Sequence, residues 1–416
     1  MLGAQAYGEW PMTAEVLAPV PNDTALPKPL VNVCFLLAVL HAAFFAAFYG
    51  RGWIFDDSRF NLPTDFINVW SAGKLALDGH PAQAWDWAIQ KQLQLGVLGQ
   101  DYPGNFAWHY PPPFLMIAEQ LARLPYRLAF AGWAAVSFLP YLVVMRAIVG
   151  RPFGWLLAAA FPVVLTNTLV GQNGFLTASL IGGVLLLLPS RPVWAGICLG
   201  LLSYKPQYGL LFPLVLIAAM QWRVFVADGV TTVLLAGVSW LAYGTESWQA
   251  FFHWMPMFSQ AFLTDGLAPW GKLQSIFALV RYFGGSEALG WTFQWIMNAA
   301  VAGLLVVLWR SRVRYEWKAA ALATGTLLVT PYLFLYDVMV LAIAAGFIVR
   351  VGLADGFARY ELPGLGVAAV LLIAFPAVGA PTGFFATLIV AALIARRCGF
   401  WQGRALAGRF ALAKRS

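Results

Sequence analysis

Long apolar runs recur along almost the whole chain, and they constrain its fold more than any other feature. Of the 416 residues, 61% are hydrophobic and only 11% are charged, which excludes a soluble core under a charged surface. Runs of roughly 17 to 22 apolar residues cross a bilayer as helices, and shorter runs do so when they are tilted or enclosed by other helices. The sequence therefore predicts an all-α polytopic membrane protein.

Twelve runs are predicted to span the membrane. The short run 114–124 is excluded because it contains Glu119 and Arg123 and would span only about 16 Å as a helix. We expect it to be re-entrant or to lie in the outer interface. The predicted spans are residues 30–50, 128–148, 153–169, 174–189, 192–204, 207–221, 225–243, 289–309, 317–331, 333–350, 362–377 and 381–396.

The basic residues set the predicted orientation. With both termini in the cytoplasm, most of the 26 Lys and Arg residues lie on the cytoplasmic side, as the positive-inside rule requires. Topology thus explains the net charge of +8, and nucleic-acid binding is not expected. The predicted parts are a cytoplasmic arm (1–29), a transmembrane domain (30–396) with long outer loops at 51–127 and 244–288, and a basic cytoplasmic tail (397–416). Because function tends to lie on long loops held by a scaffold, we expect the site on the outer side.

The first outer loop is predicted to contain two helices that lie in the outer interface. Residues 65–77 and 85–94 both carry apolar side chains at three- and four-residue spacing. Asp65 falls in the first turn of its helix, where the helix dipole favours the ionised carboxylate by a few tenths to about 1 kcal/mol, so we expect a charged base. The alternative is that Asp65 only caps the helix. The polar face of the second helix, away from the membrane, is expected to consist of Gln90, Lys91 and Gln94.

Further polar candidates lie where predicted spans meet the outer side. His109 and Tyr110 precede three prolines, which hold them on a stiff support; the alternative is a rigid entry to the next helix. Gln172 and Asn173 form a polar turn between two apolar runs, and turn chemistry alone is the alternative there. We expect all four to bind substrate.

Two charged residues lie at the boundary of predicted spans. Lys205 lies between apolar segments, where an ion is costly unless it has a partner, so it is a functional candidate. Asp337 lies about one turn inside its span, beside Tyr332, and we expect it to pair with a cation within the bundle.

The second outer loop contains cations on the side where the positive-inside trend disfavours them. Lys272 and Arg281 are suited to hold a phosphate, and Gln274 lies between them. The many aromatic residues of this loop are typical of an interfacial belt and decide little alone.

Neither a disulfide nor a metal site is predicted. Cys34, Cys198 and Cys398 lie far apart in or beside apolar runs, as packing residues do. Asp56 and Asp57 are adjacent acids in a loop, which is a weak signal for a divalent ion. We therefore expect no metal and no other cofactor.

The order of these features resembles glycosyltransferase family 87, whose best-known members are polyprenol-phosphate-mannose-dependent mannosyltransferases of the GT-C fold class. The resemblance covers roughly residues 35 to 345. Trp70 and Trp85 stand where the family usually has Tyr, so the sugar-facing surface is expected to differ. The matching residues are Asp65-Phe66, Val69-Trp70, Ala72, Gly79, Tyr110-Pro111-Pro112-Pro113-Phe114, Gly171-Gln172, Ala195-Gly196, Lys205-Pro206, Pro331-Tyr332 and Asp337.

The resemblance implies an integral membrane enzyme with a GT-C-type bundle. Such an enzyme moves mannose or another hexose from a polyprenyl-phosphate donor to a hydroxyl of a glycolipid or glycan, with inversion, at the periplasmic face of the bacterial inner membrane. Asp65 aligns with the catalytic base of the family. Lys205, together with Lys272 or Arg281, is then expected to stabilise the leaving phosphate, and His109 to contact phosphate or acceptor.

Two other functions stay open on the sequence alone. A transporter or flippase of lipid-linked sugars would show internal repeats, broken helices and charges near the middle of the membrane. No such repeat is evident, and the polar residues concentrate at one face. A purely structural membrane partner would leave the two long outer loops without a purpose.

Overall fold

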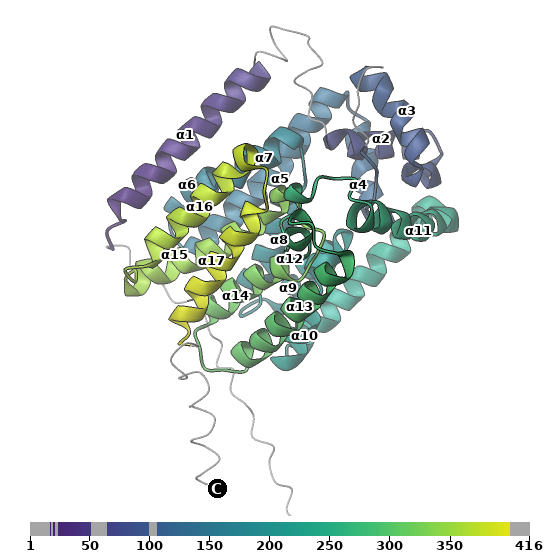
Figure 1. Ribbon diagram of the computed structural model, residues 1–416. Helices are drawn as coiled ribbons and strands as arrows, with labels where there is room; N and C mark the ends of the chain where they lie inside the picture. Colours follow the sequence, from purple (N-terminus) through teal and green to yellow (C-terminus); the bar gives the residue numbers. More distant parts are fainter. Residues whose placement is uncertain (1–16, 18–19, 21–23, 51–64, 100–105, 400–416) are drawn as a thin grey trace, which may run out of the picture.

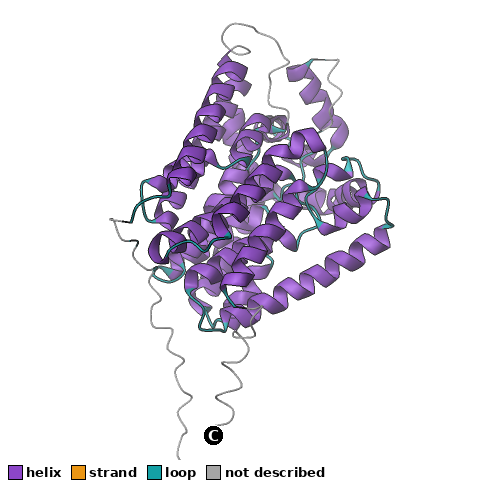
Figure 2. Ribbon diagram, turned by 60° about the vertical axis from the view of Figure 1, so that its left-hand side comes forward, coloured by secondary structure: helices purple, strands orange, loops and turns teal. Residues whose placement is uncertain are grey.

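The computed structural model of the protein describes residues 17, 20, 24–50, 65–99 and 106–399. These ranges are built from helices and loops without a strand, apart from an isolated antiparallel bridge between Leu273 and Phe334 (Figure 2). The expected all-α class is confirmed. In chain order the α-helices are α1 (Lys28–Gly50), α2 (Phe66–Leu77), α3 (Trp87–Leu98), α4 (Pro112–Ala122), α5 (Tyr126–Val149), α6 (Phe153–Ala160), α7 (Val163–Val170), α8 (Gly174–Leu187), α9 (Pro192–Leu201), α10 (Leu211–Ala218), α11 (Trp222–Ser259), α12 (Ile276–Tyr282), α13 (Glu287–Trp309), α14 (Tyr315–Leu328), α15 (Leu341–Asp355), α16 (Glu361–Val378) and α17 (Thr382–Arg397).

Short turns of other helix types connect several of these elements. The α-helices that they connect are labelled in Figure 1. The short elements are η3 (Pro81–Trp85), η4 (Leu202–Tyr204), η5 (Pro206–Tyr208), the π-turn η6 (Gln260–Thr264), η7 (Trp270–Lys272) and η8 (Leu335–Val340).

Six helices of the described part are long and apolar enough to cross a membrane, which makes the chain a multi-pass membrane protein. They are α1, α5, α11 continued by η6, α13, η8 continued by α15, and α16. The pair α6 and α7 counts as a seventh if it forms one span; its two helices meet at 63° at Pro162, which lacks the N–H that a continuous helix needs. The other predicted spans are helical but shorter, so twelve crossings remain a prediction.

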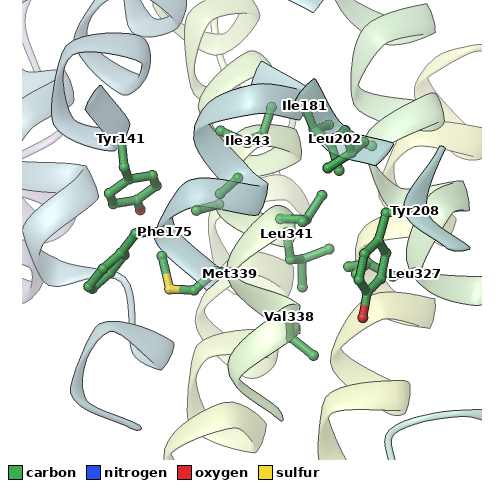
Figure 3. Close-up of a cluster of buried hydrophobic side chains, with 14 of the residues drawn as sticks. Tyr141, Phe175, Ile181, Leu202, Tyr208, Leu327, Val338, Met339, Leu341 and Ile343 are labelled. Atoms are coloured by element: carbon green, nitrogen blue, oxygen red, sulfur yellow. The ribbon is translucent and has the colours of Figure 1, made fainter. Parts of the chain in front are cut away.

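The centre of the bundle is α15, which is enclosed on all sides. Every residue from Leu341 to Leu353 is buried, and the helix packs against α5, α14 and α17. Figure 3 shows the apolar cluster at its start, where Met339 and Leu341 lie among side chains from several other helices. Cys34 and Cys398 are also buried, and all three cysteines are free thiols, as expected of packing residues.

The outer helices expose apolar side chains instead. Phe35 of α1, Leu241 of α11 and Ile296 of α13 have exposed fractions of 62%, 80% and 61%. Faces of this kind are unfavourable in water but cost nothing against lipid tails, which are equally apolar. They support the membrane environment that the apolar runs predict.

Both predicted outer loops contain helices. After residue 243, α11 continues to Ser259 beyond a break at Gly244, whose φ of 72° only glycine adopts readily. One prediction about the first of these loops is wrong. In α3, Gln90 and Gln94 do not form an exposed polar face, since both are fully buried. Their amides donate hydrogen bonds to backbone carbonyls, Gln90 to Ala84 at 2.9 Å and Gln94 to Phe106 at 2.5 Å.

The two ends of the bundle differ in chemistry. At the end that carries the α13–α14 connection, drawn at the bottom of Figure 1, the buried Arg350 donates to the carbonyl of Ile148 at 2.8 Å and lies near Glu316. Arg314 pairs there with Glu316 at 3.2 Å and with Asp355. The sequence predicts that this end faces the cytoplasm, whereas the candidate site lies at the opposite end.

Candidate active site

A cavity of about 380 Å³ lies at the end of the bundle where α2, α7, η7 and η8 meet. Five of the eleven predicted site residues line it, although they come from five separate segments of the chain. Those five are Asp65, His109, Gln172, Lys272 and Tyr332. The other lining residues are Asn68, Phe106, Ala107, Thr166, Val170, Phe262, Leu267, Ala268, Pro269, Phe334, Leu335, Tyr336 and Phe375.

Asp65 stands at the start of α2 and faces the cavity. Its carboxylate makes no capping hydrogen bond to α2, so capping does not account for it; instead Oδ2 accepts a hydrogen bond of 3.1 Å from Nε2 of Gln172. The helix itself is held tightly, because a Cβ on Gly73 would lie 2.0 Å from the carbonyl oxygen of Ala118 in α4. The segment that carries the acid is thus pressed against the bundle. Asp56 and Asp57 lie outside the described residues.

A glycine turn brings Gln172 to Asp65. Gly171 ends α7 with a φ of 67°, and a Cβ there would lie 2.6 Å from Cβ of Phe66 and 2.8 Å from the ring of Phe130. The Gly171 carbonyl accepts a hydrogen bond of 3.2 Å from the indole of Trp133. Only glycine fits between these groups, so the turn packs directly against Phe66, the first residue of α2.

His109 contributes a neutral ring to the cavity. Burial lowers its pKa to about 4, and the charge of Lys205 adds to this, while the hydrogen bond to the Ala107 carbonyl opposes it. Because a carbonyl oxygen only accepts, Nδ1 carries the proton and Nε2 is the acceptor. The ring stacks on Tyr110 at 4.6 Å and meets Tyr332 edge-on at 5.7 Å. His109 therefore offers a hydrogen-bond acceptor, and no positive charge, at neutral pH.

Lys205 and Asp337 form a buried ion pair behind the cavity wall and do not line the cavity. Nζ of Lys205 lies 2.5 Å from Oδ1 of Asp337, and their side chains are only 5% and 3% exposed. The ammonium also lies 5.5 to 5.9 Å from the ring centres of Tyr110, Tyr208 and Tyr336. Asp337 thus has the cation partner that its position predicts, and Lys205 is neutralised by it.

Lys272 is the cation that faces the cavity in the described part of the chain. It is the last residue of η7, and Gly271 before it has no room for a side chain, since a Cβ there would lie 1.9 Å from the carbonyl oxygen of Gly379. Gln274 is buried and ties this turn down: its amide donates to the carbonyls of Gly271 and Lys272 at 3.1 and 3.0 Å and accepts from N of Gly383 at 2.7 Å.

Arg281 also supports η7 from outside the cavity. Its guanidinium lies 4.8 Å from the ring centre of Trp270 and donates to the carbonyls of Gly285 and Thr264. Gln274 and Arg281 therefore position Lys272, whereas Asn173 and Tyr110 lie behind Gln172 in the wall.

Three aromatic lining residues, Phe262, Phe334 and Tyr336, are not among the predicted site residues. Together with Tyr332 they follow one another around the wall, with successive ring centres 5.4, 5.2 and 5.4 Å apart. Phe262 belongs to the aromatic-rich stretch 251–283, which was interpreted as an interfacial belt, and Phe334 and Tyr336 lie in the aromatic run just before Asp337. Such rings offer apolar faces to the C–H groups of a sugar, next to the polar groups of Asp65 and Lys272.

In a comparison with protein families, a large internal segment of this chain matches a known family. Residues 108–331 match the description Glycosyltransferase family 87, a stretch that includes His109, Gln172 and Lys272 and begins after Asp65. Comparisons with curated proteins and with solved structures gave no match. The match agrees with the transferase expectation and gives no support to a transporter. Since it covers more than half of the chain, the protein belongs to glycosyltransferase family 87.

Proposed function

We propose that the protein transfers mannose or another hexose from a polyprenyl-phosphate donor to a hydroxyl group of a glycolipid or glycan, with inversion at the anomeric carbon. One observation carries this proposal: in a member of a glycosyltransferase family, a carboxylate and an ammonium group from distant segments, Asp65 and Lys272, line the same cavity. A transfer of this kind needs one group to accept a proton and another to neutralise a departing phosphate.

Asp65 acts as the general base in this scheme. Its carboxylate takes the proton of the acceptor hydroxyl while that oxygen attacks the anomeric carbon. The bond between the anomeric carbon and the phosphate oxygen breaks from the opposite face, so the configuration inverts. The polyprenyl phosphate leaves with the bonding electron pair.

Lys272 stabilises the leaving phosphate in this scheme. Lys272 lines the cavity, whereas Lys205 is neutralised by Asp337 and Arg281 is held by carbonyls and Trp270. A charge-assisted hydrogen bond to phosphate is about twice as strong as a neutral one. With a lysine in this role, no step calls for a metal ion.

The remaining lining groups contact the sugar in this proposal. The neutral His109 accepts a hydrogen bond through Nε2, from either the donor sugar or the acceptor. Tyr332 and Phe334 present ring faces, which suit the apolar side of a hexose.

The proposed setting is the bacterial inner membrane, with the cavity on the periplasmic side of a GT-C-type bundle. The cavity residues lie at span ends that the positive-inside rule assigns to the outside, and the arginine pairs lie at the other end. A polyprenyl chain would stay among lipid tails while its phosphate reaches the cavity at the interface.

The test uses purified protein, a panel of labelled polyprenyl-phosphate sugars and a bacterial lipid extract. We expect a labelled glycosidic product, and we expect Asp65→Asn to lower kcat by about 10² to 10⁴-fold. Asp78→Asn, at the exposed far end of the same helix, is the matched control and should leave kcat unchanged. A wild-type rate for Asp65→Asn would remove Asp65 from the reaction.

The second arm tests the phosphate cation and the transport alternative. Lys272→Gln should weaken use of the donor by about tenfold or more, because a charged hydrogen bond is lost, whereas Lys74→Gln, in the last turn of α2, should not. In proteoliposomes, movement of the sugar lipid across the bilayer without any new glycosidic bond would refute the transferase proposal.

A further inference from the structure

The side-chain amide of Gln172 lies between the carboxylate of Asp65 and the hydroxyl of Tyr110. Nε2 donates to Oδ2 of Asp65 at 3.1 Å. Oε1 accepts from the hydroxyl of Tyr110 at 3.2 Å and from the backbone N–H of Asn173 at 3.3 Å. The glutamine thus uses both ends of its amide within the protein, although it lines the cavity.

These contacts allow only one orientation of the amide. A backbone N–H can only donate, so the group that faces Asn173 must be the oxygen of Gln172. The reversed amide would set N–H against N–H on that side and oxygen against the carboxylate of Asp65 on the other. The nitrogen of Gln172 is therefore directed at Asp65.

Tyr110 is itself held rigidly. It is 2% exposed, and its ring lies against those of His109, Trp108 and Phe114 at centre distances of 4.6, 5.0 and 4.8 Å. Its carbonyl accepts a hydrogen bond of 3.1 Å from the indole of Trp85. The chain of contacts thus leads from a fixed aromatic cluster through Gln172 to the carboxylate.

We infer that Gln172 is a positioning residue for Asp65: it binds one carboxylate oxygen and so fixes the direction in which the carboxylate meets the acceptor hydroxyl. The inference rests on the proposed function, in which Asp65 is the base. It goes beyond the expectation that Gln172 binds substrate, because its amide already donates one hydrogen bond to Asp65 and its oxygen already accepts two within the protein. Proton transfer requires the base within hydrogen-bond reach in a defined geometry, so loss of the anchor lowers turnover and leaves substrate affinity largely unchanged.

The first readout separates kcat from KM. Gln172→Met keeps the length of the side chain and removes both hydrogen-bonding groups; we expect kcat to fall by about 10 to 100-fold with KM for donor and acceptor within about twofold. Gln294→Met is the matched control, since that glutamine is also buried and bridges N of Phe277 and the carbonyl of Leu328, away from the cavity. An unchanged kcat with a raised KM for Gln172→Met would overturn the inference and return Gln172 to substrate binding.

The second readout does not depend on turnover. A hydrophobic carbodiimide modifies protonated carboxyl groups, and peptide mass spectrometry gives the pH midpoint for modification of Asp65. Loss of a donor to the ionised carboxylate should raise this midpoint by about one pH unit in Gln172→Met. The other titratable groups that line the cavity are unchanged in this variant, as is Tyr110 behind Gln172; they are His109, Lys272, Tyr332 and Tyr336. An unchanged midpoint would overturn the inference.

Two provisions keep the test decisive. If Gln172→Met does not fold, Tyr110→Phe takes its place: it removes one hydroxyl that holds the amide, and a wild-type kcat together with a wild-type midpoint would overturn the inference. If the wild-type protein forms no glycosidic product with any donor, the proposed function fails, while the carbodiimide midpoint still decides whether Gln172 holds Asp65.

Discussion

The buried ion pair between Lys205 and Asp337 allows a quantitative prediction. The two side chains are 5% and 3% exposed and their charged atoms are 2.5 Å apart. At an effective dielectric constant of 20 the attraction is roughly 7 kcal/mol before the cost of removing both ions from water. Removing one partner leaves the other charge buried, so we expect Lys205→Met to lower the free energy of unfolding by about 3 to 5 kcal/mol.

The reverse variant should cost less. In Asp337→Asn, the Lys205 ammonium keeps its contacts with three tyrosine rings at 5.5 to 5.9 Å, each worth about 0.5 to 2 kcal/mol. The double variant removes both charges and should recover much of the loss, which gives a coupling of at least about 2 kcal/mol. The order of stabilities is therefore wild type, double variant, Asp337→Asn and Lys205→Met.

The assay is reversible unfolding in mixed detergent micelles, followed by tryptophan fluorescence, for which the 19 Trp residues give ample signal. Lys74→Met breaks the exposed pair with Asp78, whose atoms are 3.4 Å apart, and should change stability by less than about 0.5 kcal/mol. The reasoning would be refuted if each single variant lowered the free energy of unfolding by less than about 1 kcal/mol and the two losses simply added in the double variant. The ion pair would then contribute nothing to stability.

Two further predictions concern His109 and the packing of α2. Because the pKa of His109 is lowered to about 4 from an ordinary value near 6.5, the unfolded chain binds its proton first, so stability should fall by about 1 to 3 kcal/mol as the pH drops from 6.5 to 4. Unfolding temperatures measured from pH 4 to 7.5 should depend less on pH in His109→Gln than in the wild type. The same pH dependence in both proteins would contradict the conclusion that His109 is buried and neutral. Gly73→Ala forces a Cβ to within 2.0 Å of the Ala118 carbonyl and should cost about 1 to 3 kcal/mol and much of the activity, whereas Gly96→Ala meets nothing within 4 Å and should be neutral or stabilising by about 0.5 to 1 kcal/mol. Equal effects of the two alanines on the unfolding temperature would count against the close packing of α2 on α4.

The helices of the bundle follow from the sequence because apolar runs of this length have few alternatives in a membrane. All predicted spans are helical, but their exact shape depends on local chemistry: Pro162 bends one of them, and Gly244 lets α11 change direction and continue. The aromatic residues after Gly244 pack as a helix, which an interfacial-belt interpretation does not reveal.

Polar side chains were harder to place, since their partners lie outside their own helix. Gln90 and Gln94 look like a water-facing stripe until Ala84 and Phe106 supply carbonyls for them. Lys205 looks like a phosphate ligand until Asp337 is found beside it. Charge and periodicity can thus indicate candidate residues, whereas their pairing emerges only from the packed fold.

The same limit applies to the candidate site. Asp65 was found through its place at a helix start, and Lys272 through its opposition to the charge trend. The link between Asp65 and Gln172 depends on Gly171, whose turn rests on Phe66. No local pattern connects these segments.

The enclosure of α15 has a consequence for biogenesis. Helices α5, α6 and α8 are synthesised well before α15, yet part of their inner surface, including Met145 and Gly182, is covered by α15 in the finished protein. Until the ribosome has delivered residue 355, those surfaces stay open to lipid or to an insertion factor. A nascent chain that stops after α13 should remain sensitive to membrane proteases, and the late arrival of α15 would be the event that locks the bundle.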